Sequence, residues 1–153
     1  MTLRTLTNLD DLDAALARAS THPILIFKHS ATCGVSAQAH EEIATLVGDA
    51  AWLIDVYVVS VQMGRGVSNE IARRLGLRHA SPQVLLVQDG VVRWHASHFH
   101  VTAQEIRAAV QGDASGASAP TTSDRSWRHV LGAWVSARGL VVGLLVLLSD
   151  ALG

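Results

Sequence analysis

Residues 24–36 read Ile-Leu-Ile-Phe-Lys-His-Ser-Ala-Thr-Cys-Gly-Val-Ser and contain the pattern that most strongly indicates the fold class. The apolar run at 24–27 is short and bounded by turn-forming residues, which predicts a buried β-strand. Residues 30–32 interrupt this run. A helical apolar pattern then extends from Cys33 to about residue 47, with a stop at Gly48. Cys33 is therefore expected where a buried strand passes into a helix.

This position of Cys33 has a chemical consequence. The first amides of a helix lack intrahelical partners and, together with the helix dipole, they stabilise an anion. A thiolate there has a lowered pKa, and Ser36 places a hydroxyl on the same side of the first turn. Lys28 and His29, at the end of the strand, are further sources of positive charge. The alternative is that a lone cysteine serves as a small buried apolar residue.

Helices and strands are expected to alternate along the body of the chain. In order, the pattern predicts helix 7–20, strand 24–27, helix 33–47, strand 52–61, helix 68–75, strands 84–87 and 91–94, and helix 102–111. Strands separated by helices form parallel crossovers, and the hairpin at Asp89-Gly90 adds an antiparallel edge. We expect an α/β fold with a central mixed sheet of about four strands and helices on both faces.

Polar residues mark the starts of three of these helices. Thr7-x-x-Asp10 and Thr102-x-x-Glu105 have the spacing of a capping box. Ser68 is expected to cap the third helix, which a glycine at position 76 ends.

The composition excludes several classes of protein. Of the 153 residues, 49% are hydrophobic and 16% charged, which is too apolar for a disordered chain. A net charge of −1 offers no basic footprint for nucleic acid. One cysteine excludes a disulfide framework and a Cys-rich zinc site. The first residues form no apolar signal sequence, so a cytoplasmic location is expected.

The chain divides into three stretches by composition. Residues 1–111 form the expected domain. Residues 112–124 are small and polar, as in a flexible linker, and residues 125–153 form an apolar tail expected to be helical. The fully apolar part, 139–148, is about half of the ~20 residues that span a bilayer. Contact of the tail with a membrane is therefore less favoured than packing on the domain or on a second copy.

A Ser81-Pro82 pair precedes the strand at 84–87. A strand, Cys-x-x-Ser at a helix start, a strand, a helix, Ser-Pro, a hairpin and a helix resemble the thioredoxin fold. Four blocks, at 27–36, 65–72, 79–84 and 89–98, resemble the YtxJ-like monothiol bacilliredoxins in order and spacing. These are small proteins of bacteria that use bacillithiol. The resemblance covers roughly residues 3–110.

The resemblance implies thiol–disulfide chemistry in which Cys33 attacks the bacillithiol sulfur of a mixed disulfide on an oxidised protein. Bacillithiol is then a thiol co-substrate, S-bacillithiolated proteins are the partners, and neither a tightly bound cofactor nor a metal is expected. A cis proline packs beside the reactive cysteine in this superfamily, and the backbone before it pairs with the substrate. The catalytic residues are expected to be Cys33 and Ser36, and the substrate-binding residues Ser81, Pro82, Thr32, Lys28 and Arg65.

With one cysteine the chain forms no internal disulfide, so its oxidised state is a mixed or intermolecular disulfide. Two alternatives stay open. Cys-Gly-Val-Ser at 33–36 is close to the Cys-Gly-Phe-Ser of monothiol glutaredoxins, which hold iron–sulfur clusters. The second alternative is a thioredoxin-like adaptor protein whose cysteine is inert.

Strand alternation places His98 and His100 opposite His95, and surface histidines are favoured there over a metal site. For Arg65, a solvated loop charge is favoured over a partner for a small acidic thiol.

Overall fold

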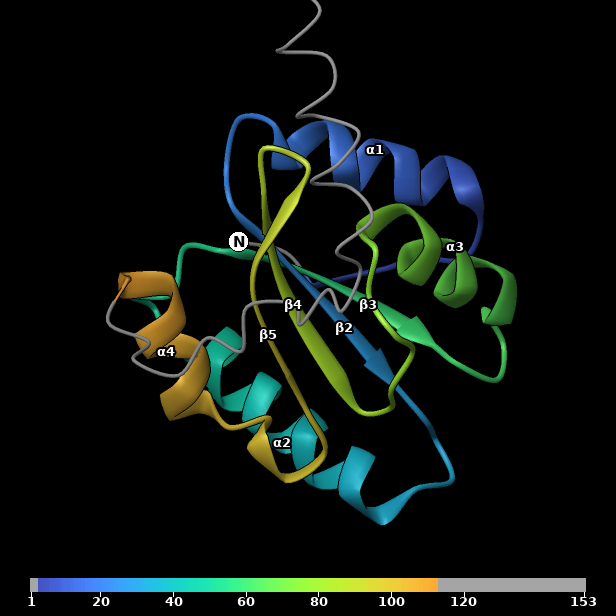
Figure 1. Cartoon of the computed structure of the whole chain (residues 1–153). Helices are drawn as coiled ribbons and strands as arrows, with labels where there is room; N and C mark the ends of the chain where they lie inside the picture. Colours follow the sequence, from blue (N-terminus) through green and yellow to red (C-terminus); the bar gives the residue numbers. More distant parts are fainter. Residues whose placement is uncertain (1–2, 113–153) are drawn as a thin grey trace, which may run out of the picture. The chain divides into compact units, whose positions relative to one another are not determined.

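The computed structural model describes residues 3–112, which form one mixed sheet flanked by helices (Figure 1). The strands are β1 (Leu3–Thr5), β2 (Ile24–His29), β3 (Asp55–Ser60), β4 (Gln83–Gln88) and β5 (Val91–Ser97). The helices are α1 (Leu9–Ala19), α2 (Gly34–Gly48), α3 (Arg65–Leu75), α4 (Ala103–Gln111) and the short 3-10 helix η1 (His98–His100). The strand order is β1-β3-β2-β4-β5. β3 pairs in parallel with both β1 and β2, β4 pairs antiparallel with β2, and β5 pairs antiparallel with β4.

The sheet has five strands, whereas the sequence predicts about four. The additional strand is β1, in which all three residues are exposed. Three exposed residues carry no hydrophobic period. Their strand conformation comes from pairing with β3, where Leu3 faces Val56 and Thr5 faces Val58.

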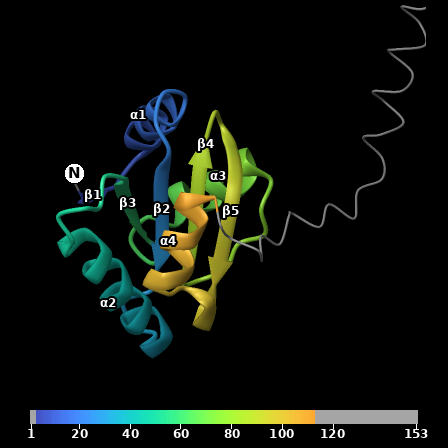
Figure 2. The same cartoon turned by 90° about the vertical axis from the view of Figure 1, so that its left-hand side faces the viewer.

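Helices cover both faces of the sheet, as expected. α2 and α4 lie on one face, and α1 and α3 lie on the other (Figure 2). Side chains of β2 alternate between the two layers. Leu25 and Phe27 are buried with α2 and α4, while Ile24 and Ile26 are buried with α1 and α3. The same alternation places the next residue, Lys28, on the α1 and α3 face.

The capping box of α1 lies one residue later than expected. Asn8 is the N-cap, and its side-chain oxygen accepts a hydrogen bond from the Asp11 amide at 2.8 Å. The Asp11 carboxylate accepts from the Asn8 amide at 3.3 Å and from the Thr7 amide at 2.8 Å. The Thr7 and Asp10 assignment is therefore wrong, because Asp11 is the carboxylate that reaches back to the cap.

The other two expected caps have different outcomes. Ser68 does not cap α3, because that helix begins at Arg65 and Ser68 is buried within it. Thr102 caps α4 as expected, and its hydroxyl accepts from the Glu105 amide at 3.2 Å.

The β4–β5 hairpin turns at Asp89 and Gly90, with φ of 54° and 70°. Positive φ at both positions is typical of the tight turns that join twisted strands, so the predicted hairpin is confirmed. β5 ends at Ser97 and passes into η1. The strand alternation expected for the histidines at 98 and 100 is therefore wrong, because both lie in the 3-10 helix.

The linker beyond Gly112 and the whole apolar tail lie outside the described residues. Within residues 3–112, no helix is both long and apolar enough to span a bilayer.

Candidate functional site

The two features singled out in the sequence meet at one edge of the sheet. β2 and β4 are antiparallel neighbours, and Lys28 near the end of β2 faces Gln83 at the start of β4. The loop to Cys33 leaves β2 at this edge, and Ser81-Pro82 enters β4 at the same edge. The Ser81–Pro82 peptide bond is cis, as the resemblance implies.

Cys33 is the N-cap residue of α2, with an extended backbone at φ −111° and ψ 123°. Its side chain is half-buried. The Ser36 amide and then the Val35 amide donate hydrogen bonds that lower the pKa of the Cys33 thiol below its ordinary value of 9.0, and the Ser36 hydroxyl adds to this. The thiol is thus both reachable and biased toward the thiolate, the form that attacks disulfides.

Ser36 is buried and has a second contact besides Cys33. Its hydroxyl oxygen accepts a hydrogen bond from the Ser30 amide at 3.1 Å. This bond connects the first turn of α2 to the loop that follows β2. Ser36 therefore both faces the sulfur and holds the loop that carries it.

The positive charge expected from Lys28 and His29 does not lower the pKa of Cys33, because every lowering contribution comes from the first turn of α2. Lys28 lies on the other face of the sheet. The His29 ring stacks on Phe27, with centroids 5.6 Å apart, and burial lowers its pKa. The nearby His40 lowers the pKa of His29 further. His29 is accordingly biased toward the neutral form.

The cis-proline loop is anchored to the end of β5. The His98 amide donates to the Pro82 carbonyl oxygen at 3.0 Å, and Pro82 is buried. Ser81 is half-buried, and its hydroxyl has no hydrogen-bond partner among residues 3–112. The residue before the cis proline therefore keeps a free polar group at the edge where Cys33 lies.

Gln62, which the sequence did not single out, holds the loop before Cys33. Its side-chain nitrogen donates to the hydroxyls of Ser30 at 2.5 Å and Thr32 at 3.2 Å. Its side-chain oxygen accepts from the Ala31 amide at 3.3 Å. Thr32, an expected substrate-binding residue, is exposed and forms part of this network.

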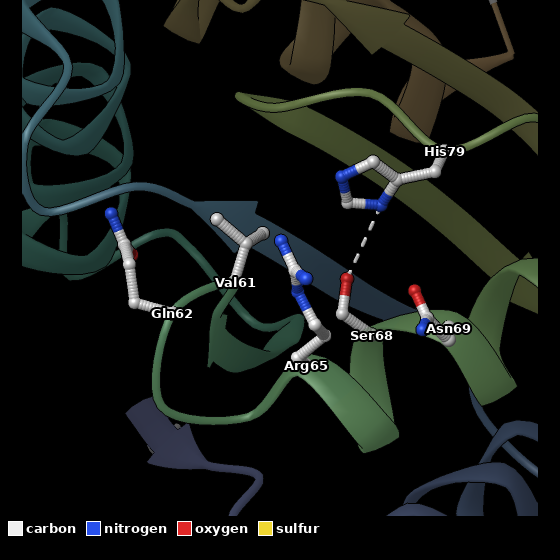
Figure 3. Close-up of a pocket in the computed structure, with 6 residues that line it drawn as sticks. All are labelled: Val61, Gln62, Arg65, Ser68, Asn69 and His79. Atoms are coloured by element: carbon white, nitrogen blue, oxygen red, sulfur yellow. Dashed lines mark hydrogen bonds between the residues drawn. The ribbon is translucent and has the colours of Figure 1, made fainter.

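Arg65 forms none of these hydrogen bonds, but together with Gln62 it lines a cavity of about 530 Å³ that we call the cationic cavity (Figure 3). The cavity is lined by Val61, Gln62, Arg65, Ser68, Asn69 and His79. Figure 3 shows Arg65 and Ser68 rising from α3 toward the His79 ring, which comes from the loop before β4. The sequence did not indicate Ser68, Asn69 or His79 as site residues. Lys28, which follows four apolar residues of β2, is a local signal of a polar site on this face.

Among residues 3–112, no group of three or more His, Cys, Asp or Glu side chains is arranged to hold a metal ion.

Solved structures share the fold. A structure described as having a thioredoxin fold is 24% identical, with a TM-score of 0.64 over 71% of this chain and 93% of that one. Fasciola hepatica thioredoxin is 14% identical, with a TM-score of 0.59 over 72% of this chain and 98% of its own. Schistosoma mansoni thioredoxin is 12% identical, with a TM-score of 0.60 over 73% and 98%. The chain therefore has a thioredoxin-like fold.

The family comparison agrees with the single cysteine and the Cys-x-x-Ser helix start. A sequence model of the monothiol bacilliredoxin BrxC matches residues 4–106, which include Cys33, the cis-proline loop and the cationic cavity. Since this match covers most of the chain, the protein belongs to the monothiol bacilliredoxin BrxC family, a family of redox thiol proteins.

Proposed function

We propose that the protein is a thiol–disulfide oxidoreductase that removes bacillithiol from mixed disulfides on oxidised proteins. One observation carries the proposal. The chain's single thiol is half-buried at the start of α2, where two amides and the Ser36 hydroxyl lower its pKa. An inert cysteine in an adaptor protein has no need of this arrangement. Membership of the bacilliredoxin family favours bacillithiol over other small thiols as the co-substrate.

The proposed reaction is a disulfide exchange in two steps. The Cys33 thiolate attacks the bacillithiol sulfur of the mixed disulfide, and a new sulfur–sulfur bond joins Cys33 to bacillithiol. The old sulfur–sulfur bond breaks, and its electron pair leaves with the target protein's thiolate. A second low-molecular-weight thiolate then attacks the bacillithiol sulfur and releases Cys33 as a thiolate. An external thiol is required because the chain has no second cysteine.

The surrounding residues have distinct roles in this proposal. Ser36 stabilises the Cys33 thiolate both when it attacks in the first step and when it leaves in the second. Ser81 and Pro82 receive the backbone of the target protein beside the sulfur, and the exposed Thr32 also contacts the target. The lowered pKa of Cys33 serves both steps, because a lower pKa raises the thiolate fraction and makes the sulfur a better leaving group.

The test is intact-mass spectrometry of the reduced protein after exposure to oxidised bacillithiol and, separately, to oxidised glutathione. We expect a bacillithiol adduct on Cys33 and release of a free target thiol from an S-bacillithiolated protein. The Cys33→Ser variant is expected to lose both. The control is Thr45→Ser, an exposed conservative change on the same helix, which is expected to keep both. Turnover retained by Cys33→Ser, or an adduct with glutathione alone, contradicts the proposal.

A further inference from the structure

Lys28 is the sole lysine of the chain, and its side chain is fully buried. Its Nζ has no hydrogen-bond partner among residues 3–112. Lysine is rarely buried unless its charge is paired, because an unpaired ammonium loses its hydration without compensation. Burial accordingly lowers the pKa of Lys28 to about 8. The cost of burying this cation points to an anionic partner that residues 3–112 do not supply.

The charge of Lys28 reaches the cationic cavity. Burial lowers the pKa of His79, and the positive charges of Lys28 and then Arg65 lower it further. Arg65 and His79 line the cavity, whereas Lys28 does not. Ser68, also buried, lies with its hydroxyl 3.4 Å from His79 Nδ1 (Figure 3). Arg65 and His79 are exposed at the mouth. None of the residues that line the cavity is acidic.

Two other arginines of α3 have their charge paired with a carboxylate. Arg73 and Arg74 both pair with Glu70, at 2.6 Å and 2.7 Å. Within the described part of the chain, neither Arg65 nor Lys28 forms a salt bridge. Uncompensated positive charge around a cavity favours an anionic ligand, and a guanidinium matches a carboxylate in particular.

The cavity borders the loop that carries the reactive sulfur. Gln62 lines the cavity and also donates to Ser30 and Thr32, just before Cys33. Gln62 therefore connects one wall of the cavity to the loop that precedes Cys33. Bacillithiol carries carboxylates on its malate group, which is the chemistry that the cavity favours.

We propose that the cationic cavity binds the carboxylates of the small thiol exchanged at Cys33, an inference that rests on the proposed function. Arg65 is the principal contact at the mouth, and His79, Ser68 and Asn69 donate from the walls. The buried Lys28 adds positive charge that reaches His79. The cavity then selects acidic thiols over uncharged ones and orients the bound thiol for exchange.

The first experiment tests the cavity without the redox reaction. L-malate is titrated into the reduced full chain while the His79 ring is followed by NMR. We expect a saturable shift that is absent with malate dimethyl ester. In Arg65→Gln the affinity is expected to fall about tenfold or more, the loss of one charge-assisted hydrogen bond. The control is Arg78→Gln, an exposed arginine that does not line the cavity, with affinity unchanged.

The second experiment measures the rate of adduct formation on Cys33 with oxidised bacillithiol and with uncharged hydroxyethyl disulfide. Arg65→Gln is expected to slow the first reaction about tenfold and to leave the second unchanged. Binding of malate with no bacillithiol adduct refutes the proposed function and leaves the cavity standing. The inference itself is overturned if malate binds Arg65→Gln as it binds the wild type, or if the variant changes both rates equally.

Discussion

Replacement of Lys28 by methionine is predicted to stabilise the protein. Burial lowers the pKa of Lys28 from its ordinary 10.5 to about 8, so the fold disfavours the ammonium. At 1.36 kcal/mol per pKa unit, the free energy that this cation costs the folded state is about 3 kcal/mol. Methionine keeps an unbranched side chain of similar volume and removes the charge. At neutral pH, Lys28→Met is therefore expected to raise the free energy of unfolding by up to about 3 kcal/mol.

The difference between the two proteins depends on pH in a definite direction. Below about pH 8, Lys28 is protonated in both the folded and the unfolded state, and the full cost is present. Between about 8 and 10.5 the unfolded state binds more protons at this site, so the stability of the wild type rises with pH. Above 10.5 the amine is neutral in both states. The advantage of Lys28→Met is thus expected to fade as the pH rises through this window.

Urea unfolding followed by tryptophan fluorescence, at several pH values from 6 to 11, measures this difference. The buffers contain no phosphate or carboxylate, because an anion in the cationic cavity would itself offset the charge. Arg78→Met, which removes an exposed cation, is the control and is expected to change stability little. Equal stability of wild type and Lys28→Met at neutral pH, or a difference that does not vary with pH, refutes the reasoning.

Three further variants test other parts of the structure. Ser36→Ala is expected to raise the pKa of Cys33, because it removes the hydroxyl that faces the sulfur. The pH dependence of thiol alkylation measures this pKa, and an unchanged value contradicts the role assigned to Ser36. Ile106→Ala is expected to cost about 2–5 kcal/mol in urea unfolding, because this α4 side chain is fully buried against the sheet, and a loss under ~1 kcal/mol would show that α4 packs only loosely. Gly90→Ala is expected to cost about 1–2 kcal/mol, because φ is 70° there, and thermal unfolding at an unchanged midpoint would rule that strain out.

Much of the fold follows from the local sequence. Apolar periodicity predicts α1 to α4 and β2 to β5, and Asp89-Gly90 predicts the hairpin, because both patterns report backbone preferences of neighbouring residues. β1 could not be predicted in this way. Its residues are exposed and too few for a period, and they form a strand only because β3 offers them hydrogen bonds.

The local environment of the Cys33 sulfur could also be predicted from the sequence. Cys33 follows a buried strand and begins a helix, and the amides of that helix lower its pKa through contacts within three residues along the chain. Nothing distant is needed for this effect, so the lowered pKa of the thiol could be predicted without the fold.

The surroundings of Lys28 were decided by the tertiary structure alone. Along the chain Lys28 is close to Cys33, yet strand alternation turns its side chain to the opposite face of the sheet. There it acts with Arg65 from α3 and His79 from the loop before β4, which only the crossovers and the strand register bring within reach. Which charges share one space depends on how distant segments pack, and no pattern within a single segment carries that information.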